Sequence, residues 1–308
     1  MCCLFGILDF GNTLSAYQRT RILATLAKAA EARGTDASGI AYNRDKGLRI
    51  YKRPLPAHRM SFQLPQDVRI IMGHTRMTTQ GDEKRNWNNH PFPGCAGRTM
   101  FALAHNGVLY NDKDLRILHQ LPQTKVETDS YVAVQLLEQE KTLDFETLGH
   151  MAEKMKGTFN FTVLDALNNT YFIKGNNPLA IYYWPDRKLY LYASTDCILK
   201  AALQHLPMRL GKSTEIAIKS GEILRIDTCG KRSYGTFSTD NINTKYYPCY
   251  FFPWEEDCWE SRANKDSYVD ELKAVAPAFG YTADDIDLLI ADGITPEDIE
   301  EYFYSGEC

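Results

Sequence analysis

The first 228 residues alternate short strand-like runs with helix-like runs, and this order restricts the possible folds more than any other feature of the chain. The opening run, CCLFGILDF, is apolar without a helical period, which predicts a buried strand. Residues 39–53 form two β-rich runs around Asn43, Asp45 and Gly47, which predicts a hairpin. The remaining strand-like runs are VRIIMGHTR, RTMFALAHNGVLY, GTFNFTVLDALNNTYFIKG, KLYLYASTD and GEILRIDT.

Helix-like runs separate these strands. Ser15 is placed to cap a helix over AYQRTRILATLAKAAEARG, which we expect to end at Gly34. The runs DSYVAVQLLEQEK and DFETLGHMAEKMK have the spacing of amphipathic helices. Because the strand-like runs occur in hairpin-like pairs, we expect antiparallel sheets with helices packed outside them, which is an α+β fold.

The charge of the chain changes near residue 230. Residues 231–308 contain 6 Lys and Arg against 17 Asp and Glu, a net charge of −11, whereas residues 1–230 carry +7. Such a difference favours two modules. We therefore predict one domain over residues 2–228 and an aromatic irregular connector over 229–260. A small acidic helical region follows over 261–308.

The acidic region contains three short helix-like runs within residues 266–304. Thr282 is a candidate N-cap for the second run, and Thr295 is a candidate N-cap for the third. The region contains no set of residues that suggests catalysis. A solvated acidic surface, and packing of the preceding aromatic run against its own chain, are the simplest interpretations. We also expect this region to contact a partner or a neighbouring subunit.

Several classes of protein fit the composition poorly. No apolar run approaches the roughly 18 residues of a membrane-spanning helix, and the start of the chain lacks the pattern of a signal peptide. We therefore expect a cytoplasmic protein whose eight cysteines stay mostly reduced. The basic residues form no dense run, so we expect no nucleic-acid partner.

Five short motifs place polar residues at predicted strand ends and turns. Taken singly, each is explained by a turn or a strand end; HNG, for example, is a common hairpin turn. In chain order the motifs are CCLFGI, RGTDASGI at 33–40, GHTRMTTQG at 73–81 with NWNNHPF at 86–92, HNG at 105–107, and ETDS at 127–130.

Together and in this order, the motifs resemble the class II glutamine amidotransferase domain, a family of N-terminal nucleophile (Ntn) hydrolases. Members of this family include glucosamine-6-phosphate synthase and the amidotransferase of purine synthesis. The resemblance runs from Cys2 to about Thr228 and includes the later pieces GTFNF and YAST. It implies a four-layer αββα sandwich of two antiparallel sheets, followed here by the small helical appendage.

The resemblance also implies roles for individual residues. Cys2 becomes the nucleophile once Met1 is removed, and its free α-amine serves as the base. Asn106 and Gly107 supply the donors of an oxyanion hole, and Arg76 binds the α-carboxylate of glutamine. The other implied positions are Asp129 for the α-ammonium group, Thr79 and Gln80 in the substrate pocket, and Arg33, His74 and His105 in support.

The three histidines at 74, 90 and 105 are interpreted as structural hydrogen-bonding residues rather than bases. A metal site formed by them is a minority alternative, because no short ligand spacing supports it. We expect no cofactor. Cys3 stands where many family members have glycine, and strand alternation turns it away from Cys2 into the core.

The implied reaction is hydrolysis of glutamine to glutamate and ammonia through a Cys2 thioester. Family members usually pass the ammonia to a fused synthase, but residues 229–308 are too few for such a domain and contain no glycine-rich phosphate loop. We therefore expect a separate ammonia-accepting synthase, or a homo-oligomer. The alternatives are a γ-glutamyl amide hydrolase with a larger substrate and a catalytically silent binding or regulatory module.

Overall fold

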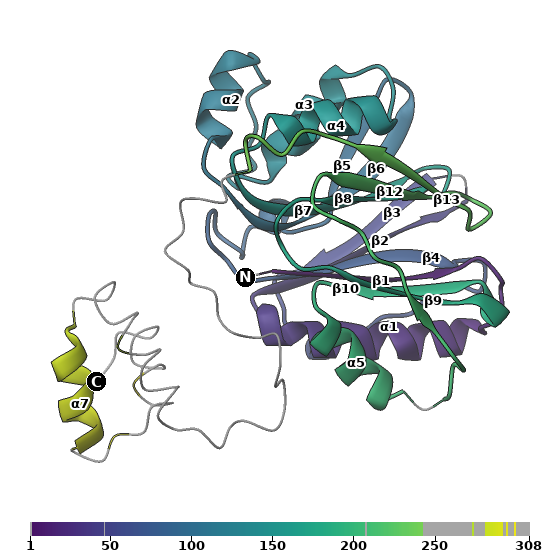
Figure 1. Ribbon diagram of the computed structural model, residues 1–308, viewed down its shortest axis with the longest axis horizontal. Helices are drawn as coiled ribbons and strands as arrows, with labels where there is room; N and C mark the ends of the chain where they lie inside the picture. Colours follow the sequence, from purple (N-terminus) through teal and green to yellow (C-terminus); the bar gives the residue numbers. More distant parts are fainter. Residues whose placement is uncertain are drawn as a thin grey trace. The chain divides into compact units, whose positions relative to one another are not determined.

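The computed structural model describes residues 2–45, 47–206, 208–242 and 281–291, with residues 273, 294 and 299. The chain divides into two compact units, Met1–Tyr246 and Tyr247–Cys308. Figure 1 shows the strands and most of the helices in the first unit.

The first unit contains two antiparallel sheets. Seven strands form the first sheet in the order β11-β9-β10-β1-β4-β2-β3, and six form the second in the order β13-β12-β8-β7-β6-β5. The strands of the first sheet are β1 (Cys3–Asp9), β2 (Ala37–Arg44), β3 (Gly47–Arg53), β4 (Ile70–Arg76), β9 (Ala180–Trp184), β10 (Leu189–Ala193) and β11 (Thr214–Glu215). Those of the second are β5 (Phe92–Ala96), β6 (Thr99–Leu109), β7 (Gly157–Asp165), β8 (Thr170–Lys174), β12 (Glu222–Ile226) and β13 (Arg232–Thr236).

Helices cover the outer face of each sheet (Figure 1). One core lies between the first sheet and helices α1 (Ala16–Ala30) and α5 (Asp196–Gln204). A second lies between the other sheet and α3 (Tyr131–Gln139) with α4 (Phe145–Glu153), near the short α2 (Asp112–Leu118). The third core lies between the two sheets, so the predicted αββα sandwich is confirmed.

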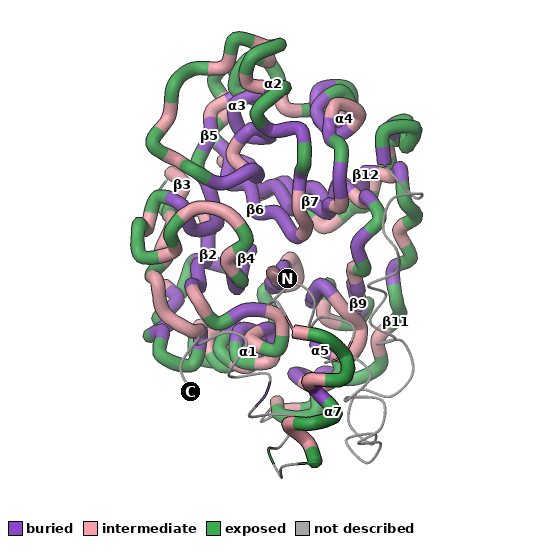
Figure 2. The backbone as a smooth tube through the Cα atoms, turned by 90° about the vertical axis from the view of Figure 1, so that its left-hand side faces the viewer, coloured by how far each residue is buried: buried purple, intermediate pink, exposed green. Residues whose placement is uncertain are grey.

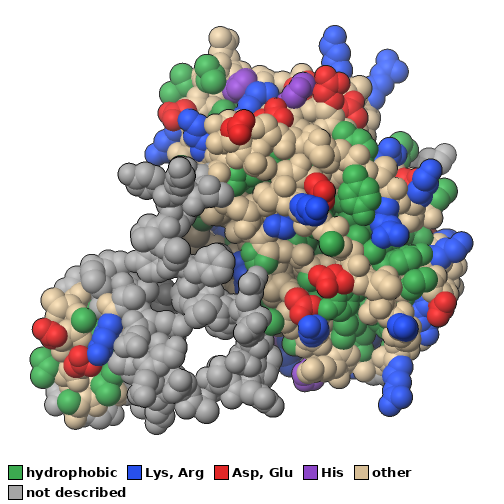
Figure 3. Space-filling model, viewed as in Figure 1, with side chains coloured by type: hydrophobic (Ala, Val, Ile, Leu, Met, Phe, Trp, Pro, Cys, Tyr) green, Lys and Arg blue, Asp and Glu red, His purple; other side chains and the backbone are tan. Residues whose placement is uncertain are grey.

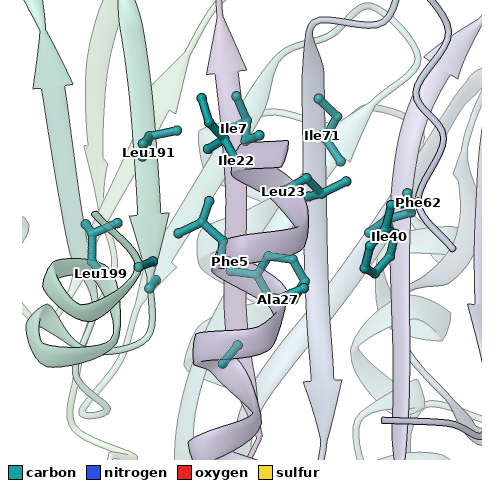
Figure 4. Packing of buried hydrophobic residues seen from close by; sticks show 14 of the residues in the cluster. Phe5, Ile7, Ile22, Leu23, Ala27, Ile40, Phe62, Ile71, Leu191 and Leu199 are labelled. Carbon is teal, nitrogen blue, oxygen red and sulfur yellow. The ribbon is translucent and has the colours of Figure 1, made fainter. Parts of the chain in front are cut away.

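Strand β1 lies in the middle of the first sheet, between β4 and β10, and all of its residues are buried. Phe5 and Ile7 point into the helix-side core, where they meet Ile22 and Leu23 of α1 (Figure 4). Leu4, by contrast, faces the core between the sheets. This alternation explains why the opening run has no polar face, since each side of the strand packs against an apolar layer.

Helix α1 begins at the predicted cap. The Ser15 hydroxyl accepts a hydrogen bond from the Gln18 N–H at 3.2 Å, and the Gln18 side chain accepts one from the Ser15 N–H at 2.8 Å. This capping box satisfies two N–H groups that the helix would otherwise leave unpaired. The α-helix ends at Ala30, and a 3-10 turn over Glu31–Arg33 carries the chain to Gly34.

The second sheet extends past the predicted boundary at Thr228. Residues Arg232–Thr236 form β13, which pairs along its whole length with β12. The start of the predicted connector is therefore part of the sheet, because a tight turn at Gly230, with φ +80°, lets the chain fold back. The aromatic run at 246–259 lies outside the described residues.

In the second unit the structure describes helix α7 (Ala283–Ala291). As predicted, Thr282 caps it: the Thr282 hydroxyl accepts from the Asp285 N–H at 3.2 Å, and an Asp285 carboxylate oxygen accepts from the Thr282 N–H at 2.7 Å. The predicted cap at Thr295 lies outside the described residues.

Basic and acidic side chains are interspersed on the face of the first unit drawn in Figure 3. None of the helices in the described ranges is long and apolar enough to cross a bilayer. The thiols of Cys2, Cys3, Cys95 and Cys229 are free, and Cys197 is disulfide-bonded.

Candidate active site

Sheet pairing brings the first motif next to the third. Strand β1 runs antiparallel to β4 with Cys3 opposite Thr75, so Cys2 and Arg76 follow at the same end of the two strands. The Cys2 thiol donates to the Met77 carbonyl oxygen at 3.6 Å, and the Arg33 Nε donates to the Cys2 carbonyl oxygen at 3.1 Å. These two contacts hold residue 2 in place. Figure 2 shows the N-terminal end of the chain near the middle of the view.

The electrostatic surroundings of the Cys2 thiol come from three of the motifs. Burial raises the pKa of this thiol, the positive charge of Arg76 lowers it, and the negative charge of Asp129 raises it. Because burial dominates, the thiol keeps its proton at neutral pH. A nucleophilic role for Cys2 therefore requires a base that removes this proton.

Arg76 ends β4, and its guanidinium group is buried. It donates to the Asn89 Oδ1 at 2.7 Å and to the carbonyl oxygens of Gln80 and Gly81 at 2.6 and 2.9 Å. All three acceptors are neutral. A buried guanidinium that is oriented by neutral groups is suited to bind the carboxylate of a ligand, because burial strengthens such a pair and the fork geometry matches.

Asp129 lies beside the end of β6, almost fully buried. One carboxylate oxygen accepts from the Leu109 N–H at 2.7 Å, and the other accepts from the Ser130 hydroxyl at 3.2 Å. An ionised carboxylate has about four lone-pair sites, so two accepted bonds leave capacity for a further donor. The carboxylate is thus oriented by the protein and still able to bind a cationic group.

Asn106 is the most unusual residue of the site. It is fully buried, yet neither its Oδ1 nor its Nδ2 has a hydrogen-bond partner among the residues that the structure describes. An unpaired buried polar group costs about 1–3 kcal/mol, and such groups in native proteins call for an explanation. A ligand that hydrogen-bonds this amide is the explanation that fits its neighbours.

Gly107 follows with a φ of +146°. A Cβ atom at this position would lie 1.9 Å from the Thr158 carbonyl oxygen, which is far inside contact distance. Only glycine fits here, so the backbone of residue 107 approaches its surroundings more closely than any other residue type would allow.

The other predicted positions are less closely involved. Thr79 is exposed, and Gln80 contributes its backbone carbonyl to Arg76 rather than a side-chain contact. Arg33 is half-buried against Cys2, and burial lowers its pKa. The site is therefore formed chiefly by residues from the first, third, fourth and fifth motifs.

Two residues that support Arg76 were not singled out from the sequence. Asn89 holds the guanidinium, and Lys52 of β3 donates to the Asn89 carbonyl oxygen and, at 3.1 Å, to that of Pro91. Burial and the positive charge of Arg76 together lower the pKa of Lys52 to about 8. The adjacent asparagines of NWNNHPF were the available signal for Asn89, since buried asparagines need hydrogen-bond partners.

The three histidines bond or stack within the protein. The His74 Nε2 donates to the His105 carbonyl oxygen at 2.9 Å, and the His105 Nδ1 lies 2.8 Å from the Ser130 hydroxyl. The His90 ring lies tilted against His74 and Phe92, with centroid distances of 4.2 and 4.3 Å. Neither His90 ring nitrogen has a hydrogen-bond partner among the described residues, so the predicted hydrogen-bonding role is wrong for His90, which packs through its ring faces. In the described ranges, no three His, Cys, Asp or Glu side chains are grouped to hold a metal ion.

Acid is expected to destabilise the protein through His74. Burial lowers the pKa of this ring to about 3. As the pH falls, the unfolded chain therefore binds a proton on this histidine before the folded protein does. The contribution of the neutral His74 ring to the free energy of unfolding is complete above about pH 6.5 and is lost progressively as the pH falls toward 3. From pH 6.5 to pH 5 the expected loss from this one group is about 2 kcal/mol.

Urea unfolding at both pH values measures this loss, with His74→Gln as the variant. Glutamine retains a donor for the His105 carbonyl oxygen but does not titrate, so the difference between the two pH values should shrink by about 2 kcal/mol. His150→Gln, at an exposed position of α4, is the matched control and should leave the difference unchanged. An equal pH dependence in the wild type and both variants would contradict this assignment.

Comparison with known proteins finds a family model and relatives that this chain resembles. Residues 74–201 match a family model described as a glutamine amidotransferase domain. Among curated proteins, the glutamine–fructose-6-phosphate aminotransferase (isomerizing) of Staphylococcus epidermidis is 29% identical over 190 residues, 59% of this chain and 30% of the relative. The enzyme of the same name from Bacillus licheniformis is 31% identical over 185 residues, 57% of this chain and 30% of the relative. The chain thus spans about a third of the length of these relatives.

Solved structures show the same fold. The glutamine phosphoribosylpyrophosphate amidotransferase from Bacillus subtilis, complexed with ADP and GMP, superposes with a TM-score of 0.59 at 21% identity, over 78% of this chain and 50% of that one. A structure described as the allosteric regulatory enzyme of purine biosynthesis gives 0.61 at 21% identity, over 79% and 50%.

Proposed function

We propose that this chain hydrolyses the side-chain amide of glutamine to glutamate and ammonia, and the match of residues 74–201 to a model described as a glutamine amidotransferase domain supports this proposal. The reaction passes through a thioester on Cys2. The observation that carries the proposal is the buried Asn106 amide, whose two polar atoms lack partners in the described part of the chain. A transient oxyanion next to Cys2 would supply the missing acceptor.

Removal of Met1 would leave Cys2 with a free α-amine whose ordinary pKa is about 7.7–8.0. This amine takes the thiol proton as the sulfur attacks the amide carbon of glutamine. The carbon–nitrogen bond then breaks, the proton passes to the leaving nitrogen, and ammonia departs. Water attacks the thioester, the carbon–sulfur bond breaks, and glutamate is released with the thiol restored.

Asn106 and Gly107 would stabilise the intermediate. The Asn106 Nδ2 and the Gly107 N–H are the two donors that point to the developing negative charge in this mechanism. The close approach allowed by glycine at 107 suits a backbone donor. Donors of this kind act mainly in the transition state, where they contribute most to rate.

Arg76 and Asp129 would recognise the amino-acid end of glutamine. The guanidinium binds the α-carboxylate in a fork, and the Asp129 carboxylate accepts from the α-ammonium group. Both side chains are buried and already oriented by neighbours, so little side-chain freedom is lost when the substrate binds.

Arg76→Lys is expected to raise the KM for glutamine, lowering kcat/KM by about 10²-fold, because lysine keeps the charge but loses the fork. Steady-state kinetics with glutamine measures the change. Arg116→Lys is the matched control: Arg116 also donates to a neutral acceptor, the Gln135 Oε1 at 2.6 Å. An unchanged KM in the Arg76 variant would remove Arg76 from the substrate site.

We propose that a separate synthase uses the ammonia, with assembly into a homo-oligomer as the alternative. The expected setting is the cytoplasm, where glutamine and reduced thiols are available.

The direct test is glutamate and ammonia release from glutamine by protein in which mass spectrometry shows Cys2 at the N-terminus. Asparagine, whose side chain is one methylene shorter, is the control substrate and should be hydrolysed much more slowly than glutamine. Equal amounts of glutamate and ammonia from glutamine are expected. Faster turnover of larger γ-glutamyl amides would favour the γ-glutamyl amide hydrolase, and no turnover of any of them would favour a silent module.

A further inference from the structure

We propose that Asn177 is a positioning residue that orients the peptide bond between Asn106 and Gly107 for catalysis. Asn177 is buried and its Nδ2 donates to the Asn106 carbonyl oxygen at 2.7 Å. The proposed function assigns the N–H of this same peptide unit, on Gly107, to the oxyanion. The inference rests on that proposed function and extends it to a residue in another loop.

The direction of the Gly107 N–H follows from peptide geometry. In a trans peptide the C=O and the N–H point to opposite sides of one plane. Because the Asn106 carbonyl oxygen points toward Asn177, the Gly107 N–H points away from it. A Cβ atom on Gly107 would lie 2.9 Å from the Asn177 Nδ2, so the amide also packs against residue 107 itself.

On the side toward which this N–H points, no strand in the described part of the chain pairs with β6 at this position. Strand β6 pairs with β7 as far as Leu109, but it pairs with β5 only as far as Leu103. Beyond Leu103, residues 104–107 therefore have a strand neighbour on one side only. Of these residues only Gly107 is partly exposed, and its N–H is the group proposed to meet a ligand.

Asn177 is itself firmly held. Its carbonyl oxygen accepts from the Asn160 Nδ2 at 2.7 Å and from the Lys174 Nζ at 2.5 Å. The Asn160 side chain also donates to the Pro178 carbonyl oxygen at 2.9 Å and accepts from the Gly175 N–H at 3.0 Å. Because Asn160 stands opposite Asn106 in the β6–β7 pair, this network fixes the loop against the strand that carries the catalytic donors.

A hydrogen bond to the carbonyl of a peptide has two effects on its N–H. It fixes the plane of the peptide, and it polarises the unit so that the N–H becomes a better donor. Both effects count mainly when negative charge develops on the substrate. Loss of this hydrogen bond should therefore lower kcat while the KM for glutamine, set by contacts at its other end, changes little.

The test is steady-state glutamine hydrolysis by Asn177→Ala and by Asn177→Asp, which keeps the shape but has no donor when ionised. The expected result for both is a fall in kcat of about 10–100-fold with KM within about 3-fold, less than removal of a whole oxyanion donor. Asn176→Ala is the matched control, because the Asn176 side chain bonds the Phe159 N–H at 3.1 Å and not the Asn106–Gly107 peptide. Its kcat and KM should stay within about 3-fold of the wild type.

Thermal unfolding of each variant shows whether it is folded. If the alanine variant does not fold, the kinetics of the aspartate variant test the proposal. An unchanged kcat in a folded Asn177 variant, or the same fall in kcat for Asn176→Ala, would overturn the positioning role. Absence of Cys2-dependent turnover in the unsubstituted protein would instead overturn the proposed function, and with it this role.

Discussion

Replacing Cys2 with alanine is expected to lower the kcat for glutamine by about 10⁴-fold or more, because the proposed reaction has no other nucleophile. The fold should survive, since the Cys2 thiol makes a single weak hydrogen bond, 3.6 Å from the Met77 carbonyl oxygen. Glutamate release under saturating glutamine, beside a thermal unfolding curve, measures both quantities.

Cys95→Ala is the matched control for this substitution. The Cys95 thiol is also half-buried and also donates to a carbonyl oxygen at 3.6 Å, that of Gly97. Its replacement should change neither turnover nor the unfolding temperature appreciably. Turnover that survives in Cys2→Ala would remove the thioester from the mechanism, whatever the result for Cys95.

Asn106→Leu is expected to change activity and stability in opposite directions. The kcat should fall by about 10²–10³-fold, the usual cost of losing one oxyanion donor. The free energy of unfolding should stay the same or rise by about 1 kcal/mol, because leucine has a similar shape and no polar atoms to leave unpaired. Urea unfolding and steady-state kinetics on the same preparation test the two parts together.

The control for Asn106→Leu is Asn160→Leu, a buried asparagine directly opposite on β7. The Asn160 amide makes three hydrogen bonds, to the Gly175 N–H and to the carbonyl oxygens of Asn177 and Pro178. Its removal should lower the free energy of unfolding by about 3 kcal/mol. Equal destabilisation by both substitutions would mean that Asn106 is a structural residue and not a group held ready for a ligand.

The sequence predicts much of the architecture because the apolar patterns match the layers that the strands and helices contact. The run at the N-terminus becomes β1, buried on both faces, and Ser15 begins the first helix. The four-layer arrangement came from the family resemblance, since the local patterns of individual strands do not specify which sheets stack.

Features that depend on distant contacts were less predictable. Helix α5 follows the β10 strand directly, and its amphipathic run after the Thr195 cap was not identified. The asparagines at 89 and 177 act through hydrogen bonds to residues 13 and 71 positions away, which no local pattern reveals. Strand β13 was missed because residues 232–236 alternate exposure at the edge of a sheet and have little apolar signal.

The measurement that tests the central claim most directly is trapping of the thioester by hydroxylamine during glutamine turnover. Hydroxylamine nitrogen attacks the thioester carbon, the carbon–sulfur bond breaks, and γ-glutamyl hydroxamate forms in place of glutamate while the Cys2 thiol regains its proton. The account predicts hydroxamate at the expense of glutamate in the wild type and neither product in Cys2→Ala. Glutamate released without hydroxamate, in both proteins alike, would contradict it.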